Sequence, residues 1–239
     1  MLFRKSIFVM SLIGCMFQFS PAFAEQWVNF IYSVSGSDNI TIIDYNCSSG
    51  AVVIPDTIDG MPVVRIGEWA FSSCTGLTSL TIPASVTSIG RMFFGGCTGL
   101  TNIYVDAANT AYSSQDGVLY NKAKTLLIAY PLGKSGGFII PDSVTSIGND
   151  AFRECTKLTS VTIPDSITNI GEGSFRDCRG LTSITIPDSI TRIRYLAFEG
   201  CTGLTSVTIP ASVTNIELEA FYGCTVLTAA YFYGNSPTM

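Results

Sequence analysis

The stretch from Leu158 to Gly180, LTSVTIPDSITNIGEGSFRDCRG, decides the fold of this chain. Three further segments of the same length align with it without gaps, and all begin with L-T-S, continue with T-I-P and carry a Phe and a Cys at fixed positions. These segments run from Leu77 to Gly99, from Leu181 to Gly203 and from Leu204 to Val226. A fixed period of about 20–50 residues is typical of solenoids, in which copies of one structural unit stack.

The first part of each copy predicts a short strand and a turn. In the segment quoted above, Val161 and Ile163 are separated by one residue, so their side chains point the same way from a strand. Pro164 ends the strand because it has no N–H to donate to a neighbouring strand. The following Asp165-Ser166 favours a turn through side-chain bonds to the nearby backbone.

The second part of each copy predicts two turns of helix. Gly171, Ser174, Phe175 and Cys178 are spaced i, i+3, i+4 and i+7, which is the spacing of one face of a short helix. A single copy buries too few apolar side chains to offset the cost of ordering its backbone. We therefore expect an α/β repeat protein, a solenoid of about eight coils with short parallel strands and short helical turns.

The inward-facing core is predicted from the repeat positions. One column of aromatic residues consists of Phe71, Phe94, Phe152, Phe175, Phe198 and Phe221. A second column consists of Cys74, Cys97, Cys155, Cys178, Cys201 and Cys224.

The pattern resembles the BspA-like leucine-rich-repeat family of bacterial surface proteins, whose 23-residue unit carries the same L-x-x-(I/V)-x-(I/L)-P and I-G-x-x-A-F-x-x-C elements. The resemblance covers about residues 26–233. It implies a curved solenoid that is secreted or held on the cell surface, where it acts in adhesion or protein binding, and it implies no catalysis.

Two regions depart from the repeat. Residues 25–50 are expected to form an N-terminal cap with two strands, before the solenoid of residues 51–239. An irregular insertion occupies about residues 106–137, where Val118 to Tyr120 and Leu126 to Tyr130 flank a short loop and predict a β-hairpin. We expect this hairpin to project from the solenoid or to pack along one edge.

Residues 1–24 read as an export signal. Arg4 and Lys5 precede an apolar run from Ser6 to Ser20, and the small residues that end at Ala24 fit a cleavage site. The alternative is a lipoprotein processing site that acylates Cys15. Either route places the mature chain outside the cytoplasm, with no transmembrane segment.

Composition excludes several classes of function. The chain has no His, which removes Ser-His-Asp and Cys-His catalysis and His-rich zinc sites. Removal of the signal also removes two of the 13 basic residues, so that 11 basic residues face 18 acidic ones and no basic stripe for nucleic acid remains. We expect neither an enzyme nor a nucleic-acid binder, and no cofactor or bound metal.

The cysteine column has two interpretations. Outside the cytoplasm it could form disulfides or hold a metal. We favour the other interpretation, in which each Cys is a small apolar residue behind the Phe column. Complete pairing is excluded because, with Cys47, the mature chain has an odd number of Cys residues.

Two surfaces are candidates for ligand binding. The outward strand positions repeat Thr81, Thr162, Thr185 and Thr208. Such a column is a solvated strand face of good β-formers in the favoured interpretation, and a ladder of hydroxyls for a glycan or protein backbone in the other. The second candidate surface is the insertion, which contains Tyr112, Tyr120, Lys122, Lys124 and Tyr130. Because Tyr is a common interface anchor, we favour the insertion for a discrete protein partner.

The leading hypothesis is therefore a secreted or cell-surface module that binds an extracellular protein or glycan. The alternative is a structural unit that associates with itself in a stalk or surface layer. The sequence does not identify the ligand.

Overall fold

The computed structural model describes residues 29–36 and 38–233. The predicted export signal, its cleavage after Ala24 and the alternative acylation of Cys15 lie outside the described residues.

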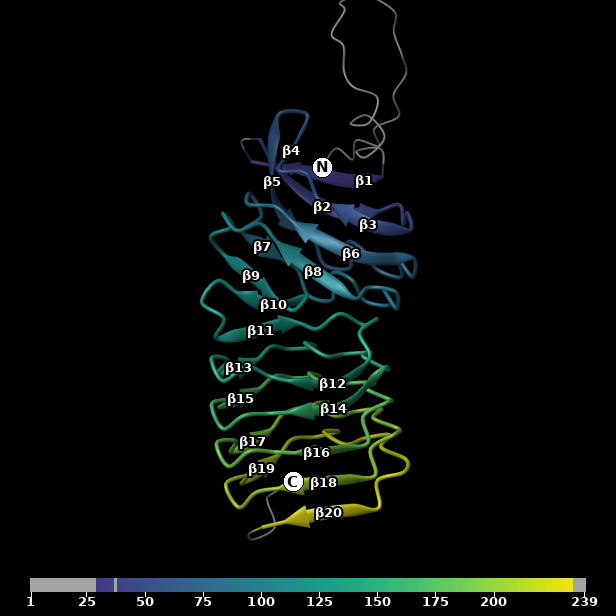
Figure 1. The fold of residues 1–239 in the computed structure, drawn as a ribbon, viewed down its shortest axis with the longest axis vertical. Helices are drawn as coiled ribbons and strands as arrows, with labels where there is room; N and C mark the ends of the chain where they lie inside the picture. Colours follow the sequence, from purple (N-terminus) through teal and green to yellow (C-terminus); the bar gives the residue numbers. More distant parts are fainter. Residues whose placement is uncertain (1–28, 37, 234–239) are drawn as a thin grey trace, which may run out of the picture.

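The chain winds into a stack of about eight coils that carry two columns of strands (Figure 1). The first column consists of β3 (Gly50–Val53), β6 (Leu77–Ile82), β8 (Asn102–Val105), β12 (Gly136–Ile139), β14 (Leu158–Thr162), β16 (Ser183–Thr185), β18 (Ser206–Ile209) and β20 (Ala229–Phe232). The second consists of β2 (Asn39–Tyr45), β5 (Met61–Ile66), β7 (Ser88–Ile89), β11 (Leu126–Ala129), β13 (Ser146–Ile147), β15 (Asn169–Ile170), β17 (Arg192–Ile193) and β19 (Asn215–Ile216). Strands that pair within a column run parallel, as stacking of identical units requires.

Four strands lie outside this regular scheme. In the region predicted to form the cap, β1 (Phe30–Ser35) pairs antiparallel with β2, and β2 pairs parallel with β5 of the first complete coil. The short β4 (Thr57–Ile58) pairs antiparallel with β5. The other two, β9 (Tyr112–Gln115) and β10 (Val118–Asn121), belong to the insertion.

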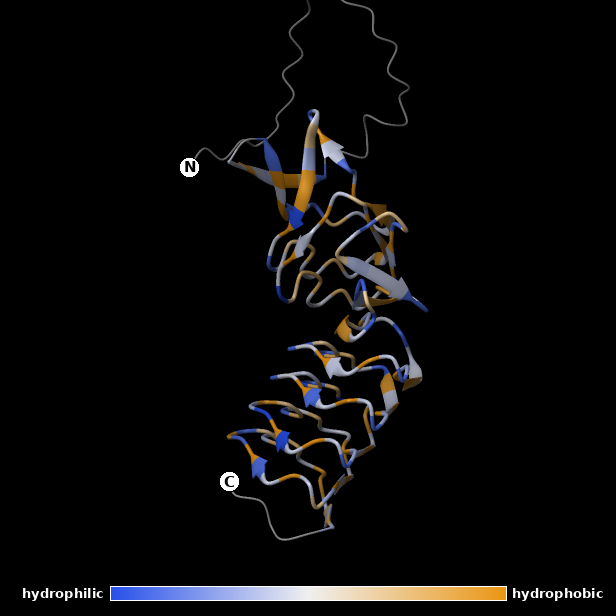
Figure 2. Ribbon diagram, turned by 90° about the vertical axis from the view of Figure 1, so that its left-hand side faces the viewer, coloured by the Kyte–Doolittle hydropathy of each residue, from blue (hydrophilic) through white to orange (hydrophobic). Residues whose placement is uncertain are grey.

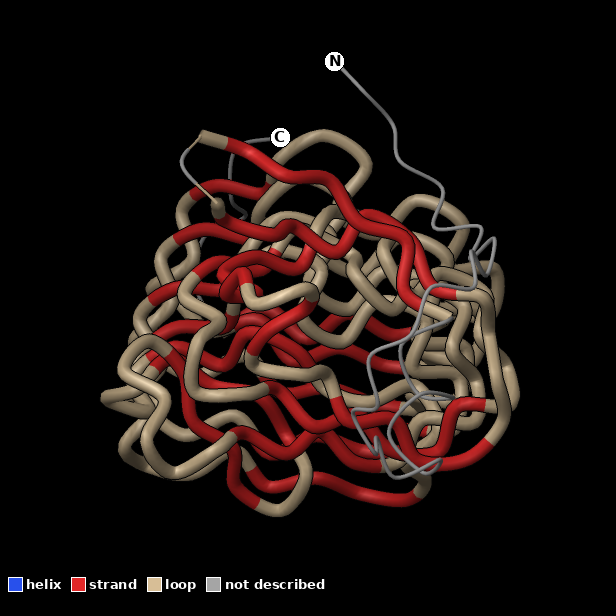
Figure 3. Tube along the Cα trace, turned by 90° about the horizontal axis from the view of Figure 1, so that it is seen from above, coloured by secondary structure: helices blue, strands red, loops and turns tan. Residues whose placement is uncertain are grey.

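The predicted helical turns are wrong, because the part of the chain that the structure describes contains no helix (Figure 3). In residues 171–178 the N–H of Phe175 donates to the Ala197 carbonyl (2.8 Å) and that of Asp177 donates to the Glu199 carbonyl (2.7 Å) in the next coil. An N–H that is bonded to the next coil is not available for the i−4 carbonyl that an α-helix needs. The structure is therefore a β-solenoid and not an α/β repeat.

Consecutive tight turns replace the helix. The N–H groups between those bonded to the next coil close short turns, as from Arg176 to the Gly173 carbonyl (3.0 Å) and from Cys178 to the Phe175 carbonyl (3.2 Å). Gly173 and Asp177 have φ values of 58° each, so the chain enters the left-handed region every fourth residue. We call the equivalent residues 67–74, 90–97, 148–155, 171–178, 194–201 and 217–224 the turn segments.

The insertion is part of the stack, and the prediction that it projects or packs along an edge is wrong. β10 pairs antiparallel with β9 and with β11, and β11 continues parallel into β13 of the following coil. Val118 and Tyr120 belong to the hydrophobic core of the C-terminal half, whereas Leu119 between them belongs to that of the N-terminal half. The insertion thus separates two cores, and Figure 2 shows the evenly spaced coils below it.

The Phe column forms a stack of rings in the C-terminal half. The ring of Phe175 lies 4.8 Å from Phe152 and 5.3 Å from Phe198, with interplanar angles of 10° and 6°. Phe221 continues the stack at 5.2 Å from Phe198 and is only partly buried. Phe152, Phe175 and Phe198 therefore each pack on rings from both neighbouring coils, and these contacts hold the coils together.

We expect Phe175→Ala to lower the free energy of unfolding by about 3–5 kcal/mol, because it leaves a cavity between two rings. Thr162→Ala, on the exposed outer side of β14, should cost less than about 0.5–1 kcal/mol. Urea unfolding of the two variants checks this. Equal losses would contradict the inward and outward assignments.

Candidate functional site

The outward threonines of the first strand column form a row of equivalent positions in successive coils of the C-terminal half. Thr185 lies opposite Thr208 in the pairing of β16 with β18, and Thr162 occupies the equivalent position in β14. Exposed apolar residues continue the row, because Ile139 pairs with Thr162 and Tyr231 pairs with Thr208. Ile139 is 74% exposed and Tyr231 is 56% exposed. We call these five residues the C-terminal strand face.

Thr81 belongs to a separate surface. It lies in the sheet β3–β6–β8, where it pairs with Val53 on one side and Tyr104 on the other. Both neighbours are about half exposed. The row of threonines expected from the sequence is therefore divided into two patches by the insertion.

The threonines of the repeat divide into two kinds. At the second position of the copy the hydroxyl donates to the preceding coil, as Thr205 does to the Thr182 carbonyl (3.0 Å) and Thr101 to the Thr78 carbonyl (3.1 Å). In contrast, the hydroxyls of Thr162, Thr185 and Thr208 have no hydrogen-bond partner among the described residues. The first kind stabilises the stack, whereas the second is available to a ligand.

The predicted aromatic anchors of the insertion lie inside the protein. Tyr120 and Tyr130 are each 1% exposed, and burial raises the pKa of Tyr130 to about 12. The Tyr130 ring packs 5.1 Å from Phe152 and so takes the place of a Phe in the column. Tyr112 is half-buried against the core of the N-terminal half. Tyr120 and Tyr130 are therefore not exposed, as anchors on the protein surface would have to be.

The lysines of the insertion hold its loops in place. Lys122 Nζ donates to the carbonyl oxygens of Asn109 (2.5 Å) and Ala107 (3.1 Å). Lys124 Nζ donates to Gln115 Oε1 (2.9 Å). Both ammonium groups are thus engaged within the fold, so that the exposed part of the insertion offers little to a partner.

The turn segments form a charged side that the sequence analysis missed. Every ion pair among the described residues has at least one partner in a turn segment, such as Arg176 with Glu199 (2.5 Å) and Arg91 with Asp150 (2.5 Å). In the sequence these charges stand singly or in adjacent pairs such as Arg153-Glu154 and Arg176-Asp177. The only signal that could have found them is that they recur at the variable positions around the Phe.

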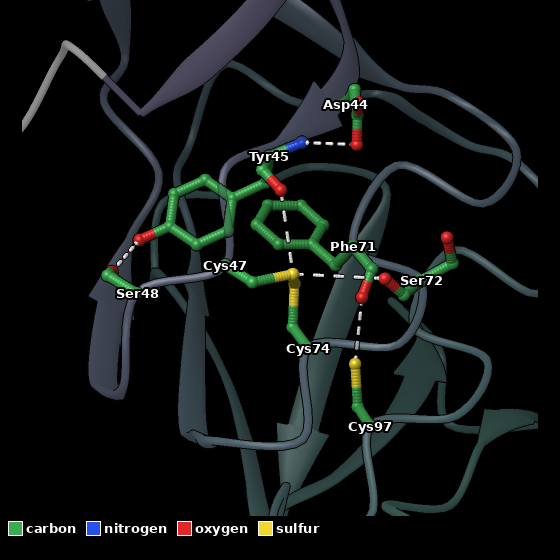
Figure 4. Close-up of a disulfide and its surroundings, with 8 residues drawn as sticks. All are labelled: Asp44, Tyr45, Cys47, Ser48, Phe71, Ser72, Cys74 and Cys97. Carbon is green, nitrogen blue, oxygen red and sulfur yellow. Dashed lines mark hydrogen bonds between the residues drawn. A yellow bond between two sulfur atoms is a disulfide. The ribbon is translucent and has the colours of Figure 1, made fainter.

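Two cysteines near the N-terminus form a disulfide (Figure 4). The Sγ atoms of Cys47 and Cys74 are bonded, so Cys74 is not the free apolar residue that the sequence analysis favoured. The other cysteines of the column are free thiols. Their Sγ atoms lie near the carbonyl of the aromatic residue of the column in the preceding coil, at 2.8 Å from Cys97 to Phe71, 3.6 Å from Cys155 to Tyr130 and 2.9 Å from Cys178 to Phe152. These thiols thus act as hydrogen-bond donors as well as filling space.

The model of the BspA type leucine rich repeat region matches residues 28–126 and 134–237, in six copies. The chain belongs to this family. No curated protein matches its sequence.

Solved structures of other repeat proteins of this kind resemble the chain. The pneumococcal vaccine antigen PcpA matches with a TM-score of 0.67 and 28% identity over 74% of this chain. A leucine rich cell surface protein from Faecalibacterium prausnitzii has a TM-score of 0.53 and 22% identity, covering 87% of this chain and 94% of its own length. A leucine-rich repeat protein from Bacteroides ovatus has a TM-score of 0.53 and 24% identity, covering 85% of this chain and 52% of its own. The chain spans 44% of the pneumococcal protein.

The described part of this BspA-type repeat protein contains neither a membrane-spanning helix nor a cluster of metal ligands. Residues 29–36 and 38–233 contain no helix long and apolar enough to cross a membrane. Within the same ranges, no group of three or more His, Cys, Asp or Glu side chains is placed to hold a metal ion.

We expect the buried free thiols of this BspA-type repeat, those of Cys97, Cys155, Cys178 and Cys201, to be unreactive in the folded protein. Burial raises the pKa of Cys97 to about 11 and also raises the pKa of Cys178, so both stay protonated near pH 8, where the thiolate is the reactive form. In the chain from residue 25, unfolding without reductant should then release the thiols of Cys97, Cys155, Cys178, Cys201 and Cys224, five per chain. Titration with a thiol reagent measures both states.

A Cys47→Ser variant provides the control, because it should add the thiol of Cys74 to that number. Fewer than five thiols in the unfolded wild-type protein would mean that the column contains further disulfides, and the interpretation of its members as buried thiols would fail.

Proposed function

We propose that this protein is an exported, non-catalytic module that binds an extracellular protein or glycan through the C-terminal strand face. The observation that carries the proposal is the row formed by Thr162, Thr185 and Thr208, whose hydroxyls have no partner among the described residues. The neighbouring Ile139 and Tyr231 leave apolar surface exposed at the two ends of this row.

The chemistry of this face fits an extended, repetitive ligand. A hydroxyl can both donate and accept a hydrogen bond. Along parallel strands the hydroxyls recur at about 4.8 Å, so a ligand lying across the coils can meet one in each coil. A glycan or an extended protein segment offers complementary groups at such intervals, and Tyr231 gives an aromatic contact at the end of the row.

Several observations favour export. The N-terminal sequence has the order of charged, apolar and small residues that export signals share. The Cys47–Cys74 disulfide also favours export, because disulfides form and persist in oxidising compartments outside the cytoplasm. Membership of a family with cell-surface members points the same way.

The absence of catalysis rests on the residues of the chain. It contains no His, and most acidic residues of the turn segments are engaged in ion pairs with arginines, namely Asp150, Glu154, Glu172, Asp177, Glu199 and Glu217. Such pairing fits a structural role better than acid–base chemistry.

Self-association is the second candidate, and β20 favours it. This strand pairs with β18 on one side only among the described strands, and Tyr231 and Phe232 on it are about half exposed. An unpaired edge with exposed aromatic residues can add a strand from a second copy. A binder should instead stay monomeric as its concentration rises, which analytical ultracentrifugation measures.

The binding test uses the chain from residue 25, immobilised and exposed to an array of glycans and purified extracellular-matrix proteins. For any partner retained, Thr162/Thr185/Thr208→Lys should weaken binding at least about tenfold, because three cations are placed across the contact surface. Surface plasmon resonance with the identified partner gives the ratio of dissociation constants.

Thr156/Thr202/Thr225→Lys is the matched control. It makes the same three substitutions at exposed positions after the column Cys, where Arg179 already stands in another coil. This variant should bind as the wild type does. Equal weakening by both variants would show an effect of net charge and contradict the proposal for the strand face.

A further inference from the structure

The insertion coil is shorter than its neighbours at one place. Its strand β11 matches β13, with Leu127 opposite Ile147, and the Tyr130 N–H donates to the Ala151 carbonyl (2.8 Å) as the Phe of a regular coil does. Phe152 follows Ile147 by five residues, whereas Tyr130 follows Leu127 by three. The coil therefore lacks two residues of the turn segment.

The missing residues leave a cavity between two turn segments. Residues 89–95 form its upper wall, residues 149–151 and Arg153 form its lower wall, and Ile128 and Leu132 lie behind. Its volume of about 120 Å³ is close to that of an apolar cavity that admits benzene, roughly 150 Å³. The space therefore accepts one aliphatic side chain.

The upper wall has an unpaired backbone donor. In three regular coils the N–H of the column Phe donates to the next coil, as from Phe152 to the Ser174 carbonyl (2.7 Å) and from Phe175 to the Ala197 carbonyl (2.8 Å). Phe94 also has a coil below it, yet its N–H has no acceptor within the described residues. Phe94 is buried and lines the cavity. More than nine in ten buried backbone groups are paired, so this donor calls for a partner.

The lower wall has the complementary acceptors. In the equivalent positions of the next coil, Glu172 and Arg176 accept N–H groups of the preceding turn segment through their carbonyls. The Asn149 carbonyl has no such donor in the described part of the chain, and the Arg153 carbonyl has only the weak thiol of Cys155 at 3.9 Å. One wall thus offers an N–H and the other offers two carbonyls.

We propose that this cavity is a binding site for a short extended peptide segment of a partner protein, which replaces the two residues missing from the coil. A carbonyl of the segment accepts the Phe94 N–H, a segment N–H donates to Asn149 or Arg153, and one aliphatic side chain fills the space before Ile128 and Leu132. This is addition of a strand to unpaired backbone, with a pocket for one side chain.

Polar contacts hold the two walls at a fixed separation. Arg91 bonds to Asp150 (2.5 Å), Glu154 Oε2 accepts the Gly96 N–H (3.1 Å), and Lys157 Nζ donates to the Thr98 carbonyl (3.2 Å). These contacts join residues 58 and 59 positions apart in the chain, across the gap that the short coil leaves. The site is therefore formed before a segment binds, which lowers the cost of ordering on binding.

The test uses the peptide acetyl-Thr-Ser-Leu-Ser-Thr-amide and the folded ¹⁵N-labelled protein. Titration followed by NMR should shift the amide resonances of Phe94, Ile128 and Ala129 to saturation, with the Phe94 proton moving downfield as it gains an acceptor. Replacement of the central Leu by Ala, or methylation of the peptide nitrogens, should each raise the dissociation constant by about tenfold.

Ile128→Trp fills the cavity and should abolish these shifts, while Val226→Trp, which places the same ring at an exposed position far along the stack, should leave them unchanged. Saturating shifts confined to Thr162, Thr185 and Thr208 would place the peptide on the strand face and overturn the inference. An Ile128→Trp protein that still binds, or benzene binding without peptide binding, would overturn it as well. Because the two surfaces do not share a residue, failure here leaves the strand-face proposal standing.

Discussion

Backbone hydrogen bonding between successive coils is the interaction on which the rest of this structure depends. In a turn segment that has a regular coil after it, every second N–H donates to that coil, as those of Gly173, Phe175 and Asp177 do. The same spacing brings the Phe rings into a stack and places thiols of the Cys column, such as those of Cys178 and Cys201, near the Phe carbonyl of the preceding coil. Because a single coil cannot satisfy these groups by itself, the stability of each coil is a property of its neighbours.

The sequence predicts which side chains face inward better than it predicts the backbone between them. Ser174, Phe175 and Cys178 are fully buried, as their spacing indicates. The same spacing misled the prediction of a helix, because consecutive turns that repeat every four residues also bring positions i, i+3, i+4 and i+7 to one side. A helix and these consecutive turns differ in the carbonyl that accepts each N–H. No side chain in the sequence indicates which carbonyl that is. The left-handed conformation of Asp177 could not be read from the sequence either, because most left-handed positions in the turn segments are not Gly.

The candidate site was predictable only in part for a related reason. Thr205 and Thr208 are the same residue type three positions apart, yet the hydroxyl of Thr205 is bonded to the preceding coil and that of Thr208 is not. Only the three-dimensional register separates them. The burial of Tyr120 had a visible signal, since Val118-Leu119-Tyr120 is a continuous apolar run, which is typical of a strand covered on both faces. Its position in a break of the repeat was instead interpreted as a sign of binding.

The regular and irregular parts of the solenoid suit different kinds of recognition. A perfectly repeated coil pairs nearly all of its backbone groups with its neighbours, so its surface can offer a ligand only side chains, and it offers the same ones in each coil. Contacts of this kind are individually weak and add along a repetitive ligand. Backbone donors and acceptors become available only at an end of the stack or where a coil is defective. The short coil around Ile128 to Tyr130 is such a defect, and the Phe94 N–H above it has no acceptor among the described residues. Recognition of one discrete segment in the interior of a solenoid therefore requires that the repeat be broken, and in this chain the insertion breaks it.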